Sequence, residues 1–186
     1  MNRKKDLYKA VLAKYLPPAF IEVVVDLMVK YPVRFKIVKP RKTKLGDFRA
    51  NHSGLHQITI NSDLNPYSFL ITTIHEFAHL VTFEEYKQRV KPHGKEWQLT
   101  YSNMIYPLIE SGELPSDISS ALLNSLINVK ASSCTDQELY RVLLSYDKQE
   151  KDVQLLEHLE KNSVFHLNGK NFTKGNLRRT RYVCID

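Results

Sequence analysis

Cysteine is scarce in this chain, which has only Cys134 and Cys184 among its 186 residues. Two thiols cannot build a disulfide framework or supply the four thiolates of a structural zinc site. Long hydrophobic runs are also missing. The most apolar early stretch, residues 20–29, is interrupted by Glu22 and Asp26 and is far shorter than the roughly 20 residues that cross a bilayer. The basic start is not followed by a signal-peptide core. We therefore expect no membrane partner and a reducing compartment, the cytoplasm.

The overall composition is that of an ordinary globular protein, with 42% hydrophobic and 25% charged residues. A length of 186 residues predicts one domain with a small appendage. A chain of this length can bury a hydrophobic core without disulfides or a structural metal. Internal repeats and low-complexity linkers are absent. These features exclude disordered, collagen-like and coiled-coil chains.

Positive charge is concentrated at the two ends of the sequence. Residues 1–50 have a net charge of +9, residues 51–162 of −6 and residues 163–186 of +4. Basic clusters can neutralise phosphates and so drive sequence-independent binding of nucleic acid, although a merely solvated surface is the alternative. The residues that we expect to contact nucleic acid are Arg34, Lys36, Lys39, Arg41, Lys42 and Lys44.

Hydrophobic periodicity indicates an alternation of helices and short strands. Helices are predicted at 5–16, 18–30, 66–81, 92–109, 114–133 and 135–161, and strands at 33–37, 46–50, 56–61 and within 164–186. Asn65 and Pro66 predict the start of the helix that follows them, because asparagine caps helices and proline fits the first turn.

The chemistry is carried by the motif His75-Glu76-Phe77-Ala78-His79 in that predicted helix. Histidines four residues apart share one helix face, so both imidazoles can reach one cation. Glu76 would then lie beside the cation and could take a proton from a water molecule bound to it. Burying two imidazoles and a carboxylate among apolar residues costs free energy unless these groups have partners. A zinc ion would be such a partner. A pair of ordinary core histidines is the alternative.

A catalytic zinc needs a third protein ligand. The candidates are His93, Glu84, Glu85, Glu96, His52 and His56. We favour His93, because Gly94 lets the backbone approach closely and the next helix can turn its start towards the first. A third histidine six residues after His79 is excluded, because Glu85 occupies that place. Glu96 as the ligand, the gluzincin arrangement, remains the alternative.

Three segments together resemble the SprT-like family: residues 58–61, the motif of residues 75–79, and His93-Gly94-Lys95-Glu96-Trp97. Residues 44–49 are similar to a glycine-containing strand ahead of that core, and the resemblance covers roughly residues 5–110. It implies an α+β fold with a compact zincin-like metallopeptidase core, in which helices pack on a small, mostly antiparallel three-stranded sheet. It also implies one Zn²⁺ ion between two helices, with His75, His79 and His93 as ligands and Glu76 as general base.

The carboxyl-terminal part departs from the family. Many members end in a cysteine-rich zinc ribbon, whereas residues 164–186 lack cysteine pairs, so we expect no second zinc. We therefore divide the chain into a SprT-like core, residues 1–112, and an extension of helices and a basic β tail, residues 113–186, that packs on the core.

The resulting prediction is a zinc-dependent metallopeptidase that hydrolyses peptide bonds in a protein or peptide substrate. By resemblance, the substrates would be proteins bound or crosslinked to DNA, with the basic cluster holding the nucleic acid near the cleft. The alternative is a non-catalytic, zinc-containing regulatory module linked to transcription. Glu76 argues against this alternative, because a structural zinc does not need it and is usually closed by four protein ligands.

Overall fold

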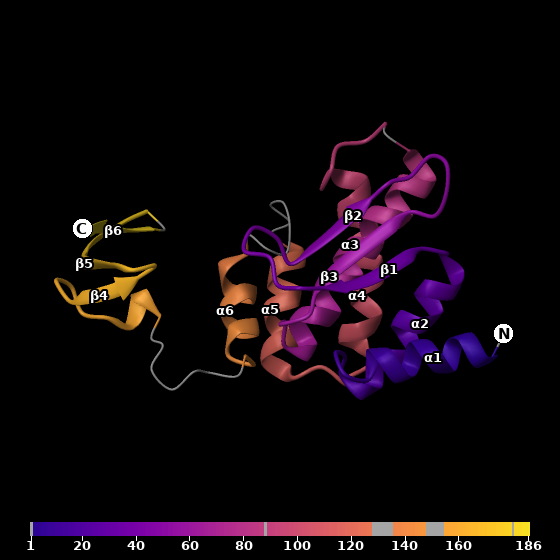
Figure 1. The fold of residues 1–186 in the computed structure, drawn as a ribbon, viewed down its shortest axis with the longest axis horizontal. Helices are drawn as coiled ribbons and strands as arrows, with labels where there is room; N and C mark the ends of the chain where they lie inside the picture. Colours follow the sequence, from indigo (N-terminus) through magenta and orange to yellow (C-terminus); the bar gives the residue numbers. More distant parts are fainter. Residues whose placement is uncertain (1, 88, 128–135, 148–154, 180) are drawn as a thin grey trace. The chain divides into compact units, whose positions relative to one another are not determined.

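The protein has an α+β fold, seen in a computed structural model that describes residues 2–87, 89–127, 136–147, 155–179 and 181–186 (Figure 1). Two compact units are formed, residues 1–148 and 149–186. The elements of the first unit are α1 (Asn2–Leu12), the 3₁₀ helix η1 (Pro18–Phe20), α2 (Ile21–Lys30), β1 (Arg34–Val38), β2 (Gly46–Arg49), β3 (Gln57–Asn61), α3 (Pro66–Tyr86), α4 (Lys95–Glu110), α5 (Ser116–Ile127) and α6 (Gln137–Leu144). The boundary that we predicted after residue 112 concerns the extent of the SprT-like core, and it stays a prediction.

The sheet of the first unit has the strand order β1-β3-β2. Strand β3 takes the centre and is the most buried strand of this sheet, with Ile58 and Ile60 fully buried. It pairs antiparallel with β2 but parallel with β1, in a register that sets Phe35 opposite Ile58. The sheet is therefore mixed, and our expectation of a mostly antiparallel sheet is corrected. The cause is topological: β3 enters between two strands that run in opposite directions.

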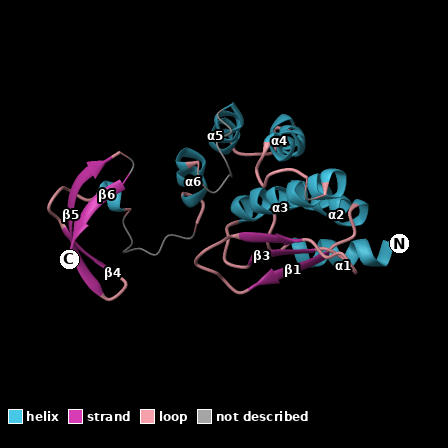
Figure 2. Ribbon diagram, turned by 90° about the horizontal axis from the view of Figure 1, so that it is seen from above, coloured by secondary structure: helices cyan, strands magenta, loops and turns pink. Residues whose placement is uncertain are grey.

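Helix α3 is the central element of this unit. Its start is as predicted, since the Asn65 side chain accepts hydrogen bonds from the backbone N–H groups of Tyr67 and Ser68. Figure 2 shows the sheet on one side of α3 and helices α4 and α5 on the other. A helix covered on both sides must be apolar around most of its circumference. Twelve of its residues are accordingly buried, including His75 and Glu76.

Several helices begin or end at residues other than those predicted. The first helix covers residues 2–12 instead of 5–16, and the helix predicted from Pro92 begins at Lys95. The helix predicted over 135–161 is shorter, with α6 ending at Leu144, and residues 128–135 and 148–154 lie outside the described ranges. In the described part of the chain, no helix combines the length and the apolar character needed to cross a membrane.

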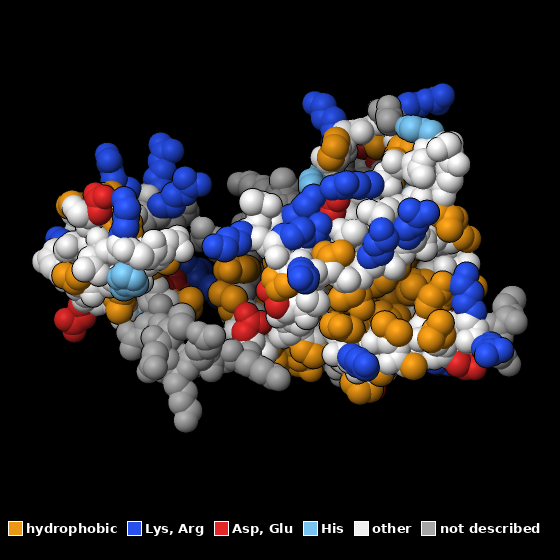
Figure 3. Space-filling view, viewed as in Figure 1, with side chains coloured by type: hydrophobic (Ala, Val, Ile, Leu, Met, Phe, Trp, Pro, Cys, Tyr) orange, Lys and Arg blue, Asp and Glu red, His pale blue; other side chains and the backbone are white. Residues whose placement is uncertain are grey.

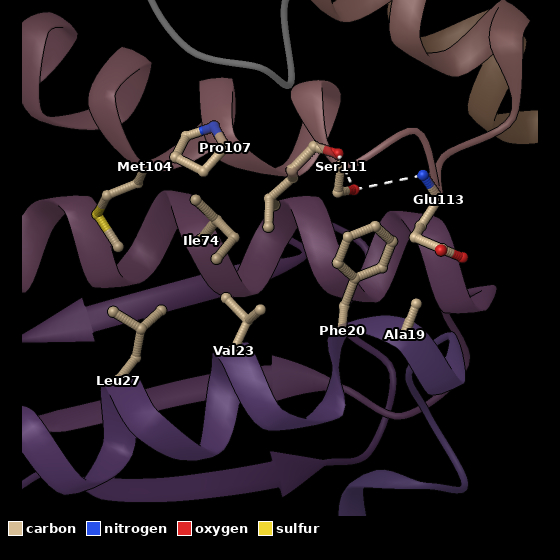
Figure 4. Close-up of a pocket in the computed structure, with 10 residues that line it drawn as sticks. Ala19, Phe20, Val23, Leu27, Ile74, Met104, Pro107, Ser111 and Glu113 are labelled. Carbon is tan, nitrogen blue, oxygen red and sulfur yellow. Dashed lines mark hydrogen bonds between the residues drawn. The ribbon is translucent and has the colours of Figure 1, made fainter.

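An apolar cavity of about 220 Å³ lies between α2, α3 and α4 (Figure 4). Val23 and Leu27 come from α2, Ile74 from α3 and Met104 from α4. At one end, the Ser111 hydroxyl donates to the carbonyl of Leu108. The packing of these three helices is therefore incomplete on the side where Ile74, the neighbour of His75, is buried.

The second unit contains the 3₁₀ helix η2 (Leu156–His158) and the strands β4 (Val164–Leu167), β5 (Lys170–Arg178) and β6 (Arg181–Ile185). The strands form an antiparallel sheet in the order β4-β5-β6. Lys174 is only 4% exposed. Its ammonium group donates to the carbonyl oxygens of Glu157 and Leu159 and lies 4.1 Å from the centre of the Tyr182 ring. The short β strands of the predicted extension are thus present, with a buried lysine among them.

Candidate metal centre

Helices α3 and α4 bring three histidines together. The Nε2 atoms of His75 and His79 are 3.1 Å apart, those of His79 and His93 are 3.0 Å apart, and those of His93 and His75 are 3.1 Å apart. The first two residues meet because positions four apart face the same way on a helix. The third comes from the loop that leads into α4. The cluster could hold a metal ion.

His93 owes its position to a tight turn. The N–H of Gly94 donates to the carbonyl of Lys91 at 2.9 Å, and His93 has a φ of +57°. Proline at the second position and a positive φ at the third are typical of a type II turn, so Pro92 belongs to the turn and not to the helix. Glycine normally fills that third position, and a histidine there carries backbone strain. The Gln98 amide steadies the turn by donating to the His93 carbonyl at 3.1 Å.

The donor set fits a zinc ion. Burial, with a smaller effect of the neighbouring histidines, lowers the pKa of His75 to about 3. Burial, followed by the charge of His93, lowers that of His79 to about 4. Burial also lowers the pKa of His93. The rings are therefore neutral at neutral pH, which is the form that binds metals. Tetrahedral bonds of about 2.0–2.1 Å would separate the nitrogens by about 3.3 Å, close to the spacing found.

The other candidate ligands do not join this cluster. The Nε2 atom of His56 lies 2.6 Å from the Glu84 carboxylate, which also pairs with Lys87. The ring of His52 packs against Phe83. Within the described ranges, the metal-ligating group contains only the three histidines, so Glu96 and Glu85 are outside it.

Glu76 lies beside the cluster against strand β2. Its side chain is 6% exposed, and a Cβ atom added to Gly46 would be only 2.5 Å from its Oε1 atom. Burial, with a contribution from the charge of Asp47, raises the pKa of Glu76 to about 8, against the opposing effect of a hydrogen bond from the Phe48 backbone. A cation at the adjacent histidines would lower this pKa, because opposite charge favours the carboxylate.

Trp97 supports all three histidines at once, and sequence reasoning gave it no role. The centre of its ring system lies 4.7 Å from that of His75, 5.1 Å from His79 and 4.6 Å from His93. Tyr101 stacks behind it at 5.0 Å with an angle of 9° between the planes. Trp97 comes four residues after His93, in the first turn of α4, and that short spacing was the available signal.

The predicted nucleic-acid residues lie on and beside the outer face of the first sheet. Blue side chains gather over this sheet in Figure 3. Four of the six are exposed: Arg34, Lys36, Lys39 and Lys42. Their side chains are therefore accessible to a ligand.

The remaining two, Arg41 and Lys44, are half-buried and engaged within the protein. The Arg41 guanidinium donates to the Asn61 side chain at 2.8 Å and to the Thr59 hydroxyl at 3.0 Å. The Lys44 ammonium donates to Asp47 at 2.6 Å. Their charges act on Glu76 and lower its pKa. The six residues, here called the basic face, thus include two whose charges reach Glu76.

Comparisons with known proteins agree with this geometry. Residues 27–115, which include all three histidines and Glu76, match the SprT-like family. The curated Protein SprT of Vibrio parahaemolyticus serotype O3:K6 (strain RIMD 2210633) is 52% identical over 48 residues, which are 24% of this chain and 28% of that protein. The chain thus matches well under two thirds of that relative's length. No solved structure matches the chain. Residues 27–115 belong to the SprT-like family.

Proposed function

We propose that the protein is a zinc-dependent metallopeptidase. The observation that carries this proposal is the meeting of three neutral imidazoles, with Nε2 atoms 3.0–3.1 Å apart, beside the buried carboxylate of Glu76. Imidazole nitrogens suit zinc, and three protein ligands leave a coordination position for water or substrate. Membership of residues 27–115 in the SprT-like family supports the same activity.

A zinc ion held by His75, His79 and His93 would supply Lewis-acid chemistry, activating water and polarising a peptide carbonyl. Glu76 would act as the general base: its carboxylate accepts the proton of the attacking water and passes it to the leaving amine. The backbone N–H of Phe48 holds this carboxylate, and the missing side chain of Gly46 leaves room for it.

We further propose that the substrates are proteins bound or crosslinked to DNA. The exposed Arg34, Lys36, Lys39 and Lys42 would hold the nucleic acid, and the charges of Arg41 and Lys44 reach the catalytic carboxylate. Neutralised phosphates release counterions, so such a face binds nucleic acid of any sequence.

The rival function is a zinc-containing regulatory module without catalysis. A structural zinc is usually closed by four protein ligands, whereas the group in the described part of the chain has three. Glu76 also has no role in a purely structural site. Both features favour the peptidase.

The deciding experiment compares the zinc-loaded protein with its Glu76→Gln variant. Zinc content is measured by mass spectrometry, and cleavage is measured on an unfolded protein with and without DNA. We expect equal zinc content and a loss of cleavage of at least about 100-fold in the variant, because the general base alone is removed. Equal cleavage by both proteins would refute the assigned base, and zinc binding without cleavage by either would favour the regulatory module.

A further inference from the structure

A pocket of about 300 Å³ opens directly beside the metal centre. Its lining includes His79 of the histidine cluster and Trp97, whose ring contacts all three histidines. Phe48 of β2 and Phe83 of α3 contribute aromatic walls. The volume is at the lower limit for ligand pockets, so the pocket suits one side chain of a larger ligand. A peptide lying at His79 would place a side chain within its reach.

Two residues of the pocket lining each have a buried polar atom with no hydrogen-bond partner among the described residues. These atoms are the hydroxyl oxygen of Thr82 and the indole nitrogen of Trp97. Thr82 is 4% exposed and Trp97 is 1% exposed. Buried polar groups are normally paired, and an unpaired one in a native structure calls for a partner. Both atoms can donate, and the indole can only donate, so the partner that they lack is a hydrogen-bond acceptor.

The positive charge around the pocket also favours a ligand with a hydrogen-bond acceptor. Lys87 and Lys91 belong to its lining. The Lys87 ammonium is 3.1 Å from the Glu84 carboxylate and lies over the Phe83 ring, while the carbonyl of Lys91 accepts from Gly94. Basic side chains around apolar walls favour a ligand that carries oxygen at the end of an apolar stem.

We propose that this pocket binds a glutamine or glutamate side chain of the peptide substrate. The aliphatic stem lies against the rings of Phe48 and Phe83, and the terminal oxygen accepts from Thr82 and Trp97. This inference rests on the proposed function, since it assumes that a peptide lies at the histidine cluster. It goes beyond that function by naming the side chain that is selected.

The test uses Trp97 as its own reporter, because the chain has a single tryptophan. The zinc-loaded Glu76→Gln variant is titrated with eight-residue alanine-serine peptides in which one position is glutamine, glutamate or leucine. Tryptophan fluorescence then measures binding without any cleavage. We expect the glutamine and glutamate peptides to bind about 5–10-fold more tightly than the leucine peptide, as one or two buried hydrogen bonds allow.

A matched pair of substitutions separates the pocket from general packing. Thr82→Val and Thr73→Val each remove a buried, unpaired hydroxyl from α3, but Thr73 lies outside the pocket lining. We expect Thr82→Val to reduce the preference for glutamine and glutamate to less than about 2-fold, and Thr73→Val to leave it unchanged. Added salt weakens the glutamate peptide more than the glutamine peptide if the lysines contribute.

The outcomes distinguish this inference from the proposed function. A leucine peptide that binds as tightly as the other two, equal behaviour of the two valine variants, or no fluorescence change with any peptide would overturn the inference. Cleavage by the unsubstituted protein without side-chain preference would leave the peptidase standing and remove the pocket's role. Selective binding of the glutamine and glutamate peptides, without cleavage by the zinc-loaded protein, would support the pocket and contradict the peptidase.

Discussion

Gly46 and Glu76 are in contact across the space between strand β2 and helix α3, and the contact leaves no room for a side chain on the strand. A Cβ atom at position 46 would be 2.5 Å from the Oε1 atom and 2.8 Å from the Cγ atom of Glu76. The strand therefore fixes the carboxylate that we assign as general base.

Replacing Gly46 with alanine should displace Glu76. We expect cleavage to fall at least about 10-fold while zinc content is unchanged, and the free energy of unfolding to fall by about 1–3 kcal/mol, since overpacking is relieved only by movement. Gly54→Ala is the control, because its added Cβ meets only the Asn51 side chain, at 3.3 Å. Activity assays and urea unfolding measure both effects. Full activity of Gly46→Ala would show that the carboxylate position is not critical.

Removing the third imidazole should release the metal. His93→Ala deletes one of three donors, so we expect zinc affinity to fall by at least about 100-fold in competition with a chelator. Glu96→Ala, in the first turn of α4, is the matched control, and its zinc affinity should be unchanged. Greater loss of zinc from Glu96→Ala than from His93→Ala would instead support the gluzincin arrangement.

The metal-free protein should lose stability in mild acid. The pKa values of His75 and His79 are lowered to about 3 and about 4 in the folded state, whereas histidine in an unfolded chain titrates near 6.5. Between these values the unfolded chain binds more protons, so stability rises with pH and falls as the pH drops from about 7 towards 4. We expect a loss of about 2 kcal/mol per buried ring between pH 7 and pH 5, measured by urea unfolding. His75→Phe should lose less over the same interval, and identical pH profiles would contradict the explanation.

Nucleic-acid binding should depend steeply on salt and on the basic face. Lys36→Gln combined with Lys42→Gln should flatten the plot of log affinity against log salt by up to about 1.8, if each lysine neutralises one phosphate of duplex DNA. The double variant Lys14→Gln and Lys30→Gln removes the same charge from the turn after α1 and from the end of α2. Equal effects of the two double variants would mean that only net charge matters, and a flat salt response would exclude the interface.

Local sequence signals predicted much of the fold. The alternation of apolar and basic residues around Phe35 predicted a strand, and Asn65 with Pro66 predicted the start of α3. The spacing of His75 and His79 likewise predicted their meeting, because four residues make about one turn of a helix. These features depend on neighbours in the sequence, which periodicity describes well.

The remaining features depend on contacts between distant segments. The parallel pairing of β1 with β3 arises from the order of strands in space, and the sequence of each strand is compatible with either direction. Pro92 resembles a helix start locally, yet it belongs to the turn that gives His93 its positive φ. The contacts of Trp97 with three histidines and of Gly46 with Glu76 also join different elements. Hydrophobic patterns contain no signal for such contacts.

The buried ammonium of Lys174 has a consequence for how the protein responds to a chelator. It gives the carboxyl-terminal strands an internal electrostatic anchor made of backbone oxygens and an aromatic face, all supplied by the polypeptide itself. Removal of zinc by a chelator should therefore destabilise only the unit that contains the three histidines, and the carboxyl-terminal strands should stay folded. The two units would then unfold in separate thermal transitions. Added zinc would raise the melting temperature of the histidine-containing unit alone.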